Sequence, residues 1–256
     1  MATLTDADLC RFARDGYLVV SGAVPEPLLA AADAEIGLLI DEVAPQEGTG
    51  GPGQNAWFQP RVRLPRCEDV LRQSAVLQIA EELVAPQSLN LAFDQIQVAI
   101  TVSPYSHIPG GPHIDGHRPD QDPPYSFTML AGVLLTDQSA PQSGNLWVWP
   151  GSHLDHSALF RERGTRVLQP TSGHVHRLEP RPVRPVLGRR VEVMGKRGDL
   201  VLAHFLLGHN KGGNMASHVR RTIYYRLAVS GHVERWESTF LDPWTEYAPV
   251  RDALAR

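Results

Sequence analysis

The sequence predicts a mainly β protein in which helices come first and an antiparallel β body follows. The 256-residue chain contains 22 glycines and 21 prolines, which indicates many short elements joined by turns. Apolar residues recur at helical spacing in the first third, whereas short β-branched runs separated by turns dominate from residue 89 onward. No composition shift marks a domain boundary. We therefore expect one domain over 1–256, with a helical part at about 1–88, a β core at about 89–230 and a tail at 231–256.

The helical part has recognisable boundaries. Thr5 and Asp8 have the spacing of a capping box, and Gly16 suits a helix end. The elements expected here are a helix ending at Gly16, a strand at 17–20, a helix at about 25–40 and a helix near 68–84.

A Gly/Pro-rich segment at 44–60 interrupts this part and carries adjacent aromatic residues, Trp57 and Phe58. A linker is the alternative, but linkers rarely contain such a pair, and loops of this length are more often functional. We expect a lid whose Trp57 and Phe58 contribute to a substrate pocket.

The β core is predicted from apolar runs bounded by turn residues. The expected strands are at 89–102, 126–136, 145–149, 189–194, 199–205 and 219–229.

Composition excludes several classes of protein. A net charge of -4 argues against a dedicated nucleic-acid binder, and no apolar run is long enough for a membrane span. Two cysteines cannot form a disulfide framework or a four-thiolate zinc site. The first residues lack the basic and apolar regions of a secretory signal, so a cytoplasmic location is the expectation. The expected partner is a small-molecule substrate, and the oligomeric state stays open.

His113 and Asp115 are the first candidate metal ligands. On an extended chain, residues two apart point to the same side, so an imidazole and a carboxylate can meet one ion. A short motif of this kind also arises by chance, and a loop histidine beside a turn aspartate is the alternative.

Three further segments follow in order: GNLWVWPGSH at 144–153, GDLVLAHFLLGHN at 198–210 and SHVRRTIYYRL at 217–227. Together with the His-x-Asp pair and the opening DLCRFARDGYLVVSGAVP at 8–25, this set resembles the phytanoyl-CoA dioxygenase family of iron(II)- and 2-oxoglutarate-dependent oxygenases. The chain departs from the family pattern in one place, where Gly144 and Asn145 replace the usual Asn-Gly.

The resemblance implies a double-stranded β-helix (a cupin-like jelly roll) with the N-terminal helices packed on one outer face. It implies that His113, Asp115 and His209 bind Fe(II), with 2-oxoglutarate as cosubstrate and O₂ as oxidant. Two histidines and one carboxylate are a facial triad that leaves coordination positions open. Because the carboxylate is present, oxidation such as hydroxylation is expected rather than halogenation.

The distal carboxylate of 2-oxoglutarate needs a planar cationic partner, which arginine supplies. Neighbours on a strand face opposite sides, so only one of Arg220 and Arg221 can point inward. The family spacing selects Arg220, which we expect to be the only interior cation without a partner. Gln97 is expected to touch the cosubstrate, and His117 to touch substrate.

The remaining histidines are given structural roles. His204 is expected to be packed or to support the site, His153 to close a turn, and His156 and His232 to lie at the surface or in loops. A cupin-like binding protein is the main alternative function, and a zinc hydrolase is a poorer one. No residue identifies the substrate, for which a small secondary metabolite is our expectation.

Overall fold

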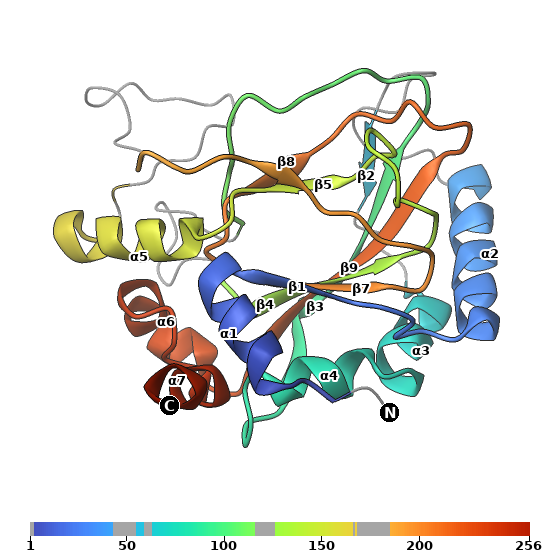
Figure 1. Ribbon diagram of the computed structural model, residues 1–256. Coiled ribbons are helices and arrows are strands. Elements are labelled where there is room, and N and C mark those ends of the chain that lie inside the picture. The colour runs from blue at the N-terminus through green and yellow to red at the C-terminus, as the bar shows by residue number, and fades with distance from the viewer. Residues whose placement is uncertain (1–2, 43–54, 59–62, 116–125, 166, 168–184) are drawn as a thin grey trace.

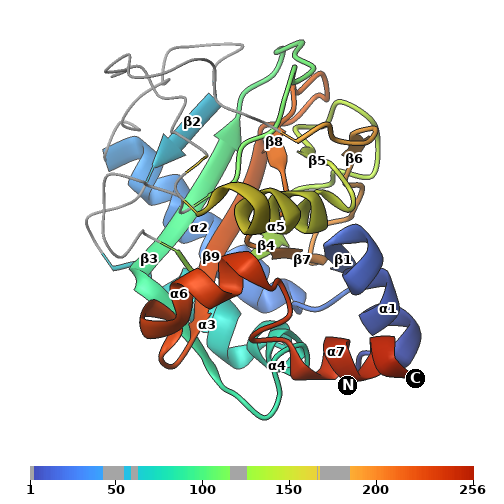
Figure 2. The same ribbon diagram turned by 90° about the vertical axis from the view of Figure 1, so that its left-hand side faces the viewer.

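The computed structural model describes residues 3–42, 55–58, 63–115, 126–165, 167 and 185–256. Two antiparallel sheets lie apart from each other, with helices around the larger one (Figures 1 and 2). The helices are α1 (Asp6–Asp15), α2 (Glu26–Glu42), α3 (Pro65–Gln73), α4 (Val76–Glu82), α5 (Ser152–Arg163), α6 (His232–Leu241) and α7 (Ala248–Ala255). The strands are β1 (Tyr17–Val20), β2 (Asn55–Phe58), β3 (Leu89–Thr101), β4 (Met129–Leu134), β5 (Leu146–Val148), β6 (Val191–Glu192), β7 (Leu200–His204), β8 (His209–Lys211) and β9 (Arg220–Val229).

The larger sheet has the strand order β1-β7-β4-β9-β3-β2, and the smaller one has the order β6-β5-β8. Neighbouring strands are antiparallel in both sheets. The antiparallel, sheet-rich body predicted from the sequence is therefore confirmed.

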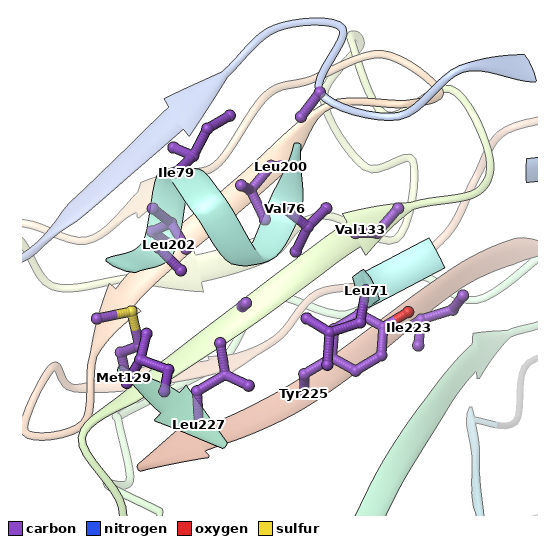
Figure 3. Close-up of a cluster of buried hydrophobic side chains, with 14 of the residues drawn as sticks. Leu71, Val76, Ile79, Met129, Val133, Leu200, Leu202, Ile223, Tyr225 and Leu227 are labelled. Atoms are coloured by element: carbon purple, nitrogen blue, oxygen red, sulfur yellow. The ribbon is translucent and has the colours of Figure 1, made fainter. Parts of the chain in front are cut away.

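The larger sheet is covered on both faces, which explains why its strands read as nearly continuous apolar runs. On β9, Ile223 and Tyr225 belong to the cluster shared with the first four helices, whereas Tyr224 belongs to the cluster between the sheets. Helices α3 and α4 lay Leu71 and Val76 on the outer face of the sheet (Figure 3). The other face of the sheet is thereby left to form a site.

Helix α1 ends where the sequence predicts. The Thr5 hydroxyl accepts the Asp8 backbone N–H, the Asp8 carboxylate accepts the Thr5 N–H, and Gly16 terminates the helix with φ 80°. A side chain at Gly16 would also collide with His153, because a Cβ there would lie 2.5 Å from the imidazole Nδ1. Both the backbone angle and the available space therefore require glycine.

The single helix expected near 68–84 is two helices. Ser74 separates α3 from α4 with an extended backbone (φ -104°, ψ -172°). Its hydroxyl donates to the Val70 carbonyl and accepts the Val76 N–H, so one side chain serves the end of α3 and the start of α4.

The strand expected at 17–20 is present as β1, and it joins the larger sheet although it comes from the helical part. Strand β2 and the tail helices α6 and α7 were not predicted. Helix α5 begins within the Pro-Gly-Ser-His segment, with Gly151 at its N-cap and Ser152 and His153 in its first turn. Of the lid expected at 44–60, only β2 lies within the described residues. No helix in the described ranges is long and apolar enough to cross a membrane.

Candidate metal centre

A backbone pairing brings the two candidate histidine ligands together. His113 and His209 face each other as an antiparallel bridge, with N–H to carbonyl distances of 3.0 and 2.9 Å in the two directions. Directly opposite residues in such a bridge hold their side chains close, and the two ring centroids are 4.5 Å apart. The bridge itself was not predicted, since His113 lies outside any expected strand.

Asp115 completes the group from the loop that follows His113. Its Oδ1 lies 3.5 Å from His113 Nε2 and 3.6 Å from His209 Nε2. Each of the three residues offers one ligand atom, and these atoms all lie within 4.8 Å of one another. Imidazole and carboxylate donors suit a divalent iron, so the residues present fit that metal.

The surroundings prepare these groups for ligation. His209 Nδ1 lies 2.9 Å from the Leu207 carbonyl, and donating a proton there leaves Nε2 free to face Asp115. Burial opposes the charge of Asp115, but the two facing imidazoles and the charge of Arg226 outweigh it, and its pKa falls well below the ordinary value. Burial also acts to lower the pKa of His209, but the facing carboxylate of Asp115 and its negative charge raise that pKa overall. The carboxylate is therefore ionised at neutral pH, as a ligand must be.

A cavity of about 710 Å³ opens beside the three residues and lies between the two sheets. The larger sheet contributes Gln97, Leu130, Tyr224 and Arg226, and the smaller sheet contributes Leu146, His209, Asn210 and Lys211. This volume suits a small molecule together with a cosubstrate.

The two neighbouring arginines point in opposite directions. Arg220 is buried on the inner side of β9, where its guanidinium donates to the Tyr224 hydroxyl at 2.9 Å and to Gln138 at 3.4 Å. Arg221 points outward and pairs with Asp33 of α2 at 2.9 Å. Arg220 does not itself line the cavity, but Tyr224, which accepts its hydrogen bond, does.

Two other cations do line the cavity, and sequence reasoning missed both. Arg226 lies against Asp115, and half-buried Lys211 has a pKa lowered by desolvation. Interior cations near the site are therefore not limited to Arg220; that Arg220 is the only one without an ionic partner stays a prediction, since Arg226 pairs with Asp115. Strand parity contained the signal, because Arg226 is an even number of residues from Arg220 and Lys211 is two from His209.

The other candidates are placed as follows. Trp57 and Phe58 lie on β2, opposite Ala99 and Val98 of β3 in the backbone register, and His117 falls outside the described residues.

Several histidines are more buried than expected. His204 is packed as predicted, with Nε2 2.8 Å from the Pro243 carbonyl. His156 and His232 do not lie at the surface: His156 bonds the Leu206 carbonyl, and His232 bonds Glu246 at 2.8 Å. Both belong to helices that the sequence did not predict, α5 and α6, and these helices bury them.

The fold and this site define a protein with two antiparallel sheets around a His/Asp/His centre. The model of the phytanoyl-CoA dioxygenase family matches residues 12–222, and the chain belongs to that family. A search of curated proteins finds no significant match.

Solved structures share the fold at low sequence identity. The non-heme alpha-ketoglutarate-dependent epimerase SnoN from nogalamycin biosynthesis is 20% identical, with a TM-score of 0.60 over 86% of this chain and 80% of its own. The carbocyclase SnoK from the same biosynthesis is 18% identical, with a TM-score of 0.59 over 88% and 84%. HygX from Streptomyces hygroscopicus, with nickel and 2-oxoglutarate bound, is 17% identical, with a TM-score of 0.58 over 89% and 88%.

Proposed function

We propose that this chain is an iron(II)- and 2-oxoglutarate-dependent oxygenase. It hydroxylates or otherwise oxidises a small organic molecule and releases succinate and CO₂. The observation that carries the proposal is the convergence of His113, Asp115 and His209 beside a cavity of about 710 Å³. Membership of the phytanoyl-CoA dioxygenase family supports the same reaction class.

His113, Asp115 and His209 are the residues that would hold the iron. Three protein ligands would leave coordination positions open for the cosubstrate and for the oxidant. The bound iron supplies the oxygen chemistry, while the protein positions both substrates and limits access of water. The apolar residues Leu130 and Leu146 on opposite walls of the cavity serve this last purpose.

Arg220 is the proposed anchor for the distal carboxylate of 2-oxoglutarate. Its guanidinium is 3% exposed and bonds only neutral groups among the described contacts, Tyr224 and Gln138. A buried cation with neutral partners gains most from an anionic ligand. Gln97, which lies opposite Tyr224 in the register of β3 and β9 and lines the cavity, is the proposed polar contact.

We also infer that the two sheets are the two walls of a double-stranded β-helix, with α1 to α4 on the outer face of the larger wall. The shared cluster of these helices and that sheet supports this arrangement. Because similar structures include an epimerase and a carbocyclase, oxidations other than hydroxylation are within reach of this fold. Both of those enzymes come from nogalamycin biosynthesis, which supports a small secondary metabolite as substrate here, with Trp57, Phe58 and His117 as proposed contacts.

The test begins without a substrate. Under anaerobic conditions, Fe(II) and 2-oxoglutarate should together give a visible charge-transfer absorption that neither gives alone. His209→Ala and Asp115→Ala should abolish it, whereas Arg220→Met should shift its 2-oxoglutarate dependence to at least tenfold higher concentration. Arg221→Met is the matched control, since Arg221 pairs with Asp33 on the outer face.

The second stage is a screen for succinate release against a panel of small metabolites in air. Succinate that depends on both a metabolite and Asp115 supports the oxygenase. A wild-type protein that binds iron but never binds 2-oxoglutarate contradicts the proposal and favours a cupin-like binding protein.

A further inference from the structure

Arg226 is the one arginine among the described residues that contacts a proposed metal ligand. It lies on the inner face of β9, opposite Leu130 of β4, and is 9% exposed. Its NH2 lies 2.6 Å from Asp115 Oδ2, and its guanidinium carbon lies 5.6 Å from the centre of the Phe127 ring. Asp115 is the only acid with which Arg226 pairs in the described part of the chain.

The two oxygens of Asp115 have different partners. Oδ1 faces His113 Nε2 and His209 Nε2, at 3.5 and 3.6 Å, whereas Oδ2 is turned to Arg226. A free carboxylate can bind a metal through one oxygen or through both. The guanidinium hydrogen bond occupies Oδ2 and fixes the plane of the carboxylate.

We propose that Arg226 is a positioning residue that restricts Asp115 to one-oxygen coordination. This role of Arg226 rests on the proposed function, because it concerns the metal bound by His113, Asp115 and His209. Two-oxygen binding would fill a coordination position that 2-oxoglutarate or O₂ requires. Arg226 thus acts through Asp115 to keep three positions open.

Charge and positioning predict opposite effects on metal affinity. A fixed positive charge beside a divalent cation repels it, so removing Arg226 for its charge alone would tighten metal binding. Groups that orient a metal ligand do the reverse, and their loss typically costs about 10- to 100-fold in affinity. Positioning dominates here because the hydrogen bond is short and buried.

The experiment compares Arg226→Met and Arg226→Lys with the wild type, and uses Arg221→Met as the control on the other face of β9. Calorimetry measures Co(II) affinity, and circular dichroism and thermal unfolding confirm that each variant is folded. We expect Arg226→Met to weaken Co(II) binding by about 10- to 100-fold. Arg226→Lys should recover part of the loss, because it keeps a donor but not the planar fork. Arg221→Met should bind Co(II) like the wild type.

A second readout reports coordination directly. At saturating Co(II), two-oxygen ligation in Arg226→Met should change the visible Co(II) absorption and weaken 2-oxoglutarate binding, with partial recovery in Arg226→Lys. Unchanged or tighter Co(II) binding in Arg226→Met would overturn the inference. If 2-oxoglutarate binding falls in that variant while Co(II) binding does not weaken, Arg226 acts as an anion anchor instead.

Asp115→Ala separates this inference from the proposed function. If Asp115→Ala binds Co(II) as tightly as the wild type, the metal site itself is wrong. If Asp115→Ala loses Co(II) while Arg226→Met keeps it, only the role of Arg226 is wrong.

Discussion

The buried imidazole of His153 should make the stability of this protein fall in mild acid. His153 is fully buried in α5, its Nε2 lies 3.1 Å from the Ala13 carbonyl, and its Nδ1 has no hydrogen-bond partner among the described residues. Burial lowers its pKa from an ordinary 6.5 to about 4. Below pH 6.5 the His153 imidazole therefore binds a proton in the unfolded chain but stays neutral in the folded chain until the pH approaches 4.

The size of the effect follows from the two pKa values. Lowering the pKa of His153 from 6.5 to about 4 corresponds to a total change of roughly 3 kcal/mol in the free energy of unfolding. The free energy of unfolding contributed by His153 is complete above about pH 6.5, falls as the pH decreases, and is fully lost below about pH 4. At pH 5 about 2 kcal/mol of it has been lost.

His153→Gln tests this reasoning, because glutamine can still donate to Ala13 but does not titrate. Urea unfolding at pH 7.5 and pH 5.0 gives the change in free energy of unfolding for each protein. We expect the wild type to lose about 2 kcal/mol more than His153→Gln over this range, whatever the absolute stability of the variant. Leu154→Gln, at an exposed neighbouring position, should keep the wild-type loss. Equal losses in the wild type and His153→Gln would refute a buried neutral histidine.

Three other perturbations have expected outcomes. Gly16→Ala should lower the free energy of unfolding by about 2–4 kcal/mol, because the backbone there is left-handed and a Cβ would collide with the His153 imidazole. Gly22 also has a left-handed backbone but no atom within 4 Å of an added Cβ, so Gly22→Ala should lower it by only about 1 kcal/mol. Denaturant titration of both variants measures the two changes. Glu246→Gln should lower the free energy of unfolding by about 3 kcal/mol, since this buried side chain accepts hydrogen bonds from His232 and Thr128. An unchanged melting temperature would contradict that role. Lys211→Met should weaken 2-oxoglutarate binding at saturating metal, as measured by calorimetry, because it removes a positive charge from the cavity wall; unaltered binding would exclude Lys211 from the cosubstrate site.

Local sequence patterns were enough to predict those helices and strands whose formation depends on interactions between residues close in the chain. The Thr5 capping box and Gly16 marked α1, since a cap depends on residues three or four apart. The apolar runs of β4, β7 and β9 predicted strands, because a strand that is buried on both faces is a nearly continuous apolar segment. Parity on β9 gave the opposite directions of Arg220 and Arg221.

The candidate site was visible in the sequence only as an ordered set of motifs. His113, Asp115 and His209 were singled out by their order and by family resemblance, and no local rule requires them to meet. Their meeting depends on the bridge between His113 and His209, which joins segments almost a hundred residues apart. A pairing over that distance is fixed by the register of whole sheets.

Tertiary structure alone decided the rest. The burial of His153 and His232 follows from the packing of α5 and α6. The sequence pattern of α5 is too weakly amphipathic to predict that helix, whereas α6 is amphipathic and was missed in the sequence. Arg226 reads in the sequence as one more charge on a strand, and only the folded chain brings it 2.6 Å from Asp115. The sequence determined which residue types were available and which way alternate side chains point, because those properties are local. Which of these side chains meet was decided by the packing of two sheets against each other, since that packing depends on contacts between residues far apart in the chain.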